Sequence, residues 1–60
     1  KAKIYAAIRE VIEEAIRDER HIDKETFLAE ICLQFGYGRR YAIEDLNTVV
    51  KGNGFNVEWA

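Results

Sequence analysis

The stretch DKETFLAEICLQFGYGRRYAIEDLNTVV, residues 23–50, decides the fold of this chain. Apolar residues recur in it every three or four positions on both sides of the tripeptide Gly36-Tyr37-Gly38. The first stripe is Phe27, Leu28, Ile31 and Phe35, and the second is Ala42, Ile43, Leu46, Val49 and Val50. This spacing is typical of amphipathic helices, and a Gly-containing tripeptide between two of them indicates a tight turn. We therefore predict two helices joined by residues 36–38.

Signals at the ends of the first of these helices support this prediction. Asp23 is a good N-cap, because its carboxylate can accept hydrogen bonds from the free N–H groups of the first turn. Ile22 and Phe27 occupy the two positions of a hydrophobic staple around that cap. Gly36 suits the left-handed conformation that commonly ends a helix. Cys32 lies at the edge of the apolar stripe, whereas Leu33 projects away from it.

Upstream, a third helix is predicted from Ala2 to about Arg20, with no Gly or Pro to interrupt it. Its apolar stripe is Ile4, Ile8, Val11, Ile12, Ala15 and Ile16, and its opposite side is Lys3, Glu10, Glu13, Glu14 and Arg17. Two interpretations of the acidic side stand: a docking surface for a basic partner, or the solvated back of a helix.

Downstream, Lys51-Gly52-Asn53-Gly54 should end the last helix, since Gly and Asn tolerate positive φ. Phe55, Val57 and Trp59 then alternate with polar residues, which predicts a short half-buried strand. Its only local partner would be an extended piece around Ile22, and Trp59 should cap the core beside the first helix. The fold class predicted is mainly α, a three-helix core with a short C-terminal β-strand.

Length and composition set limits on this fold. Sixty residues make one small domain with a thin stability margin, and the single cysteine excludes an internal disulfide. The net charge of −2 argues against strong non-specific binding of nucleic acid, although the bases Arg39 and Arg40 stand together at a predicted helix start. No apolar run reaches the length of a membrane span, and we expect an intracellular protein (cytoplasmic, nucleoid or nuclear). The absence of Met suggests a trimmed domain or a processed start, and we expect residues 1–60 to be a single domain of a larger protein.

Residues 33–46, LQFGYGRRYAIEDL, resemble a run found in winged helix-turn-helix domains, L-x-x-x-G-(hydrophobic)-S-R-R-T-V-x-x-x-L. The resemblance covers roughly residues 22–59, since GNGFNVE at 52–58 is similar to the family's turn into its first wing strand. It implies a truncated winged helix that binds duplex DNA through the third helix, in a transcription or replication protein. The chain departs from the pattern at Gly38 and Ala42, and at Glu44 and Asp45, where many DNA readers carry basic or neutral residues. Helical periodicity places Glu44 on the outer side of the last helix, with Asp45 toward the far edge of that side.

The candidate nucleic-acid-binding residues are Tyr37, Gly38, Arg39, Arg40, Tyr41, Asn47 and Lys51. Arginine can bind guanine or phosphate in a bidentate manner, tyrosine hydroxyls can reach phosphates, and asparagine can read adenine. Gly38 would allow close approach of another backbone, and Lys51 would contact the DNA backbone. The alternative interpretation of Arg39 and Arg40 is a solvated helix end.

A second hypothesis is a protein-interaction module of the same fold that does not bind DNA. Its candidate contacts are Leu33, Phe55 and Val57, with an open strand edge that could accept a partner strand and with the acidic first helix. Enzyme activity is not predicted, because His21 and Cys32 have no partner base, nucleophile or second metal ligand. No cofactor and no metal site are predicted.

Overall fold

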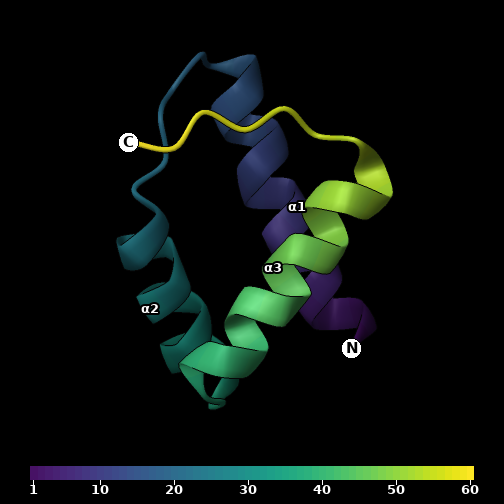
Figure 1. Ribbon diagram of the computed structural model, residues 1–60, viewed down its shortest axis with the longest axis vertical. Helices are drawn as coiled ribbons and strands as arrows, with labels where there is room; N and C mark the ends of the chain where they lie inside the picture. Colours follow the sequence, from purple (N-terminus) through teal and green to yellow (C-terminus); the bar gives the residue numbers. More distant parts are fainter.

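Three helices make up the fold in the computed structural model, which describes residues 1–60. Helix α1 spans Ala2–Arg17, α2 spans Lys24–Phe35 and α3 spans Arg39–Asn53. In Figure 1, α1 and α3 run in the same general direction and α2 runs against them. The turn between α2 and α3 lies near the N-terminus, and the C-terminal tail crosses the opposite end of the molecule. The three helices predicted from the sequence are confirmed.

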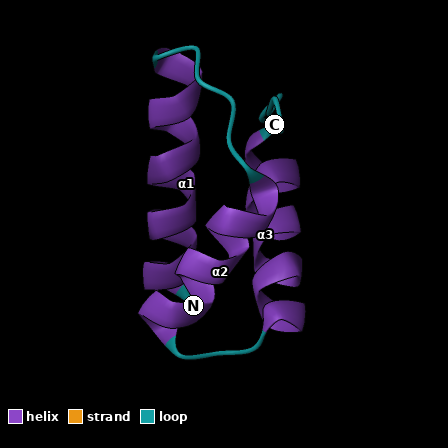
Figure 2. Cartoon of the chain, turned by 90° about the vertical axis from the view of Figure 1, so that its left-hand side faces the viewer, coloured by secondary structure: helices purple, strands orange, loops and turns teal.

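Helix α3 is the element against which both other helices pack (Figures 1 and 2). Ala42, Leu46 and Val49 form its buried stripe, with exposed fractions of 4% or less. Eight buried side chains from the three helices make one core: Ile8, Ile12, Phe27, Leu28, Ile31, Ala42, Leu46 and Val49. Helices α1 and α2 touch each other much less than either touches α3.

Helix α1 is three residues shorter than the sequence suggested, since it ends at Arg17 rather than near Arg20. The cause is Glu19, which adopts a left-handed φ of 55°. The Arg20 amide donates to the Ala15 carbonyl at 2.8 Å and the Glu19 amide donates to the Ile16 carbonyl at 3.2 Å. These two bonds form a Schellman ending, which satisfies carbonyls that a helix terminus leaves free.

The stripe predicted on α1 is also wider than the buried one. Ile8, Ile12 and Ala15 are buried, but Val11 and Ile16 remain 37% and 45% exposed. The reason is that α1 packs against α3 with one side only, so the edges of its apolar stripe stay uncovered. Val11 therefore faces the seam between α1 and α2.

The ends of α2 follow the sequence signals. Asp23 Oδ1 accepts hydrogen bonds from the amides of Glu25 and Thr26 at 3.1 and 3.4 Å. Ile22 packs against the core that contains Phe27, as expected for the two staple residues. Gly36 adopts a φ of 65°, and its amide donates to the Cys32 carbonyl. Cys32 is half-buried and Leu33 is exposed, as predicted.

The predicted C-terminal strand is not formed. Residues 55–60 contain one isolated parallel bridge, Ile22 to Trp59. The Ile22 amide donates to the Glu58 carbonyl at 3.2 Å, and the Ala60 amide donates to the Ile22 carbonyl at 2.8 Å. Ile22 is the only residue between α1 and α2 that bridges to the tail, so the contact is too short for a regular ladder. Trp59 is half-buried against the core and lies under the Lys24 ammonium of α2, 5.5 Å from its ring centroid.

Leu28 and Leu33, on the same helix, give a matched test of the core. Leu28 is 1% exposed and Leu33 is 86% exposed. Leu28→Ala should lower the free energy of unfolding by about 2–5 kcal/mol, because it leaves a cavity, whereas Leu33→Ala should change it by less than about 0.5 kcal/mol. Urea unfolding followed by circular dichroism measures both. Equal losses would contradict the assignment of the core face of α2.

Two glycines give a matched test of backbone strain. Gly36 has a left-handed φ, whereas Gly52 lies inside α3 with open space where a Cβ would stand. Gly36→Ala should destabilise the domain by about 1–2 kcal/mol. Gly52→Ala should stabilise it by about 0.5–1 kcal/mol, because alanine loses less entropy in a helix. Thermal unfolding of the two variants should show shifts in Tm of opposite sign.

Candidate nucleic-acid interface

The outer face of α3 carries most of the candidate residues. Arg40, Tyr41, Asn47 and Lys51 are all exposed, together with Glu44 and Thr48. The positions 40, 44, 47, 48 and 51 repeat at helical spacing, so they form one stripe opposite the buried one. We call this stripe, with Tyr41 at its edge, the outer α3 face. It has two bases and one acid.

Neither base of the outer α3 face is neutralised within the chain. Arg40 and Lys51 form no salt bridge, and the pair Arg40 and Glu44 is not formed. At 1.5 Å per residue they are about 16 Å apart along the helix axis, with Glu44 and Asn47 between them. The Thr48 hydroxyl donates to the Glu44 carbonyl at 2.9 Å, so this hydroxyl is engaged within the helix.

Arg39, in contrast, is engaged with another helix. Its Nη2 donates to both carboxylate oxygens of Glu25, each at 2.8 Å. Both side chains are more than half exposed. An exposed ion pair of this kind contributes at most about 1 kcal/mol, since water screens it and ordering two long side chains costs entropy. It ties the start of α3 to the start of α2.

Tyr37 does not present its hydroxyl to solvent. The side chain packs against the core, and the buried hydroxyl has no hydrogen-bond partner. Its ring stacks on that of Tyr41, with centroids 6.5 Å apart and an interplanar angle of 16°. The prediction that the Tyr37 hydroxyl reaches a phosphate therefore gains no support, whereas the 53% exposed Tyr41 remains available. Gly38 is the exposed N-cap of α3, and a Cβ there would meet only the Tyr41 ring, at 3.8 Å.

Asp45 is buried, contrary to the prediction from the sequence. It was expected toward the outer edge of α3, yet it is 2% exposed. Its Oδ1 accepts a hydrogen bond from Lys1 Nζ at 2.8 Å, and its Oδ2 has no hydrogen-bond partner. Lys1 is 44 positions away in sequence, so local periodicity gave no signal for this ion pair. The pair fastens the first residue of the chain to the middle of α3.

The polar cluster of Lys1, Tyr37 and Asp45 shifts two pKa values. Burial raises the pKa of Tyr37 to about 12, and the negative charge of the neighbouring Asp45 carboxylate adds to the increase. The hydrogen bond to Asp45 also raises the pKa of Lys1 above its usual value. Both groups therefore keep their protons more firmly in the folded state than in the unfolded chain.

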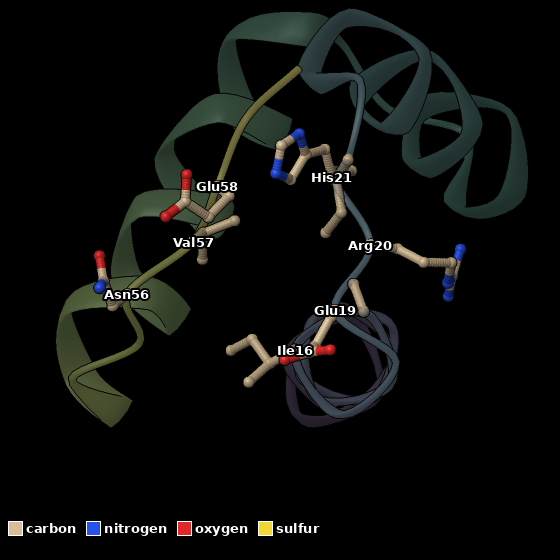
Figure 3. Close-up of a pocket in the computed structure, with 9 residues that line it drawn as sticks. Ile16, Glu19, Arg20, His21, Asn56, Val57 and Glu58 are labelled. Atoms are coloured by element: carbon tan, nitrogen blue, oxygen red, sulfur yellow. The ribbon is translucent and has the colours of Figure 1, made fainter.

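A cleft of about 300 Å³ lies at the other end of the molecule (Figure 3). The end of α1 and the following linker form one wall, and the C-terminal tail forms the other. His21 and Glu58 border the cleft, and the Arg20 side chain extends away from the tail. No group of His, Cys, Asp and Glu residues is placed to hold a metal ion. The lining of the cleft contains no Ser, Thr, Cys or Lys side chain.

Comparison with known proteins adds nothing to these observations. No family model, no curated protein and no solved structure matches the chain. The likeness of residues 33–46 to winged helix-turn-helix domains therefore stays a prediction. No helix in the structure combines the length and apolar character needed to cross a membrane.

Tyr37→Phe tests the buried polar cluster. The pKa of Tyr37 is about 12 in the folded state and 10.0 ordinarily. The stability that the protonated Tyr37 contributes is therefore fully present below pH 10 and is lost as the pH rises through 12. The variant should lose less stability over that interval than the parent domain, with a residual loss from Lys1. Tyr41→Phe, which alters the exposed ring, should behave like the parent. Urea unfolding across this pH range measures the loss of stability in each variant. An equal loss in Tyr37→Phe and in the parent domain would contradict the raised pKa of Tyr37.

Proposed function

We propose that the domain binds duplex DNA through the outer α3 face. The observation that carries this proposal is the placement of Arg40 and Lys51, two exposed cations with no internal partner at the two ends of one helical stripe. Phosphate neutralisation by such cations supplies most of the affinity of a DNA-binding domain. The resemblance of the turn region to winged helix-turn-helix domains supports the same surface.

The groups between the two cations suit contact with base edges. Asn47 can bind the N6 and N7 atoms of adenine, and Glu44 can accept a hydrogen bond from the N4 amino group of cytosine. A glutamate that reads cytosine also explains how an acid can stand on a recognition helix. A major groove of about 12 Å admits one helix, with its flanking cations directed at the phosphates on either side.

Arg39 can contact DNA only after it leaves its partner Glu25. Its pairing with Glu25 leaves it oriented at the N-terminus of α3, beside the exposed Gly38. A phosphate can replace the Glu25 carboxylate, because an exposed ion pair is weak and arginine also forms charge-assisted hydrogen bonds with phosphate. Lys51 and Arg40 would then make the primary contacts, and Arg39 would make an additional one.

The test is a pair of double variants with identical changes in net charge. Arg40→Glu with Lys51→Glu removes both cations from the outer α3 face, whereas Lys3→Glu with Arg9→Glu removes two exposed cations from α1. Fluorescence anisotropy with a mixed-sequence duplex should show at least about tenfold weaker binding for the first variant and a shallower salt dependence, by roughly one unit of slope per phosphate contact. The α1 variant should remain within about twofold of the parent domain, because its lost charges act only at long range and are screened.

Two results would contradict DNA binding through α3. One is the absence of binding by the parent domain even at low salt. The other is an equal loss in both double variants, which would indicate attraction to net charge rather than to the outer α3 face. Circular dichroism of each variant checks that the helices persist.

A second candidate function, a protein-interaction module, is favoured by Leu33. This leucine is 86% exposed on α2, close to the turn. The tail offers less than the sequence suggested, because Phe55 and Val57 are half-buried against the core. The Phe55 amide is also occupied by the Val50 carbonyl, at 3.1 Å. A protein partner that binds through Leu33 should bind equally well at low and high salt, and Leu33→Glu should abolish its binding. Binding of a DNA duplex should instead weaken with salt and should not depend on Leu33.

A further inference from the structure

A groove runs along the seam between α1 and α2, on the side of the molecule away from the outer α3 face. Two hollows of about 200 and 190 Å³ lie along this seam. They share Val11, Phe27 and Glu30, so they lie next to each other and together form a shallow depression. It exists because α1 and α2 pack on α3 and touch each other little, which leaves the seam between them incompletely filled. We call this depression the seam groove.

The floor of the seam groove is apolar. Phe27 and Ile31 of α2 are buried beneath it, and Phe35 is half-buried at one end. Val11 of α1 is 37% exposed and lines both hollows. Phe27 and Ile31 are only 5% and 3% exposed, so the apolar surface that remains open in the seam groove belongs to Val11 and Phe35. An additional element could therefore bury apolar surface here without any change in the three helices.

The rim of the seam groove is acidic at the first hollow, whereas Arg20 and His21 line the second hollow together with Asp23 and Glu30. Glu10 and Glu14 of α1 and Glu30 of α2 border the first hollow, which has no lysine, arginine or histidine in its lining. Glu10 and Glu30 form no salt bridge, and Glu14 has only a 4.0 Å contact to Arg17. Three carboxylates that flank an apolar floor create a local negative potential. This potential disfavours DNA, an anionic membrane or a second copy of the acidic α1 as the occupant.

We propose that the seam groove is the docking site of a basic amphipathic helix from a partner protein. Along α1 the groove extends from Ala7 to Ala15, about 12 Å at 1.5 Å per residue, which accommodates two turns of a helix. Apolar anchors at i, i+4 and i+7 of the partner fill the floor beside Val11 and Phe35. Lysines or arginines on both flanks pair with Glu10, Glu14 and Glu30. The docked helix completes a four-helix arrangement, and its binding does not depend on α3 contacting DNA.

Two synthetic helical peptides test the docking proposal on the whole domain. Both peptides carry the same leucine stripe, one with lysine and one with glutamate on its flanks. Fluorescence anisotropy should show that the lysine peptide binds, and that the glutamate peptide binds at least about tenfold more weakly, because like charges oppose it at the rim. Val11→Ser should weaken the lysine peptide several-fold, by roughly the loss of one apolar contact. Val11 is partly exposed, so this variant still folds.

A matched pair of charge variants localises the binding. Glu14→Lys with Glu30→Lys changes the rim, and Glu13→Lys with Glu44→Lys makes the same change in net charge outside the groove. The rim variant should bind the lysine peptide at least about tenfold more weakly than the variant outside the groove. No binding of the lysine peptide, equal binding of the two peptides, or equal losses in the two charge variants would each overturn the proposal. Circular dichroism confirms that each variant is folded before binding is compared.

Discussion

The packing of the inner stripe of α3 against both other helices is the interaction on which the rest of the structure depends. Ala42, Leu46 and Val49 are the residues of this stripe that are almost completely buried. The small Ala42 suits a close approach of the helices near the turn, where a larger side chain would hold them apart. With so short a chain, no disulfide and no other large apolar cluster, loss of this packing would leave each helix too short to persist alone.

This packing also divides the surface of the domain into distinct regions. Because the inner side of α3 is used for the core, its opposite side is free to carry Arg40, Asn47 and Lys51 outward. Because α1 and α2 make most of their contacts with α3, the seam between them stays open as an apolar groove with an acidic rim at the first hollow. The net charge of −2 is therefore unevenly distributed, with free cations on the outer α3 face and carboxylates beside the seam groove. A nucleic acid and a basic helix could be bound on different faces at the same time.

Local signals in the sequence predicted the helices well, and long-range contacts explain what they missed. Asp23 and Gly36 fix the ends of α2 through contacts within a few residues, so the sequence reveals them. Asp45 is different, because the Lys1 ammonium that accompanies its burial comes from the opposite end of the chain. The tail failed to form a strand for a similar reason, since alternation in residues 55–59 says nothing about the length of the partner at Ile22. The pairing of Arg39 with Glu25 likewise depends on how α2 and α3 meet, and it reduces the free cations at the turn to Arg40.

DNA binding through the outer α3 face can be tested by NMR, from the change in backbone amide chemical shifts as a short mixed-sequence duplex is added at low salt. The largest changes should cluster at Arg40, Tyr41, Glu44, Asn47 and Lys51, with little change at Val11 and Glu30 in the seam groove. Changes confined to α1 and α2, or no changes at all, would contradict DNA binding through the outer α3 face.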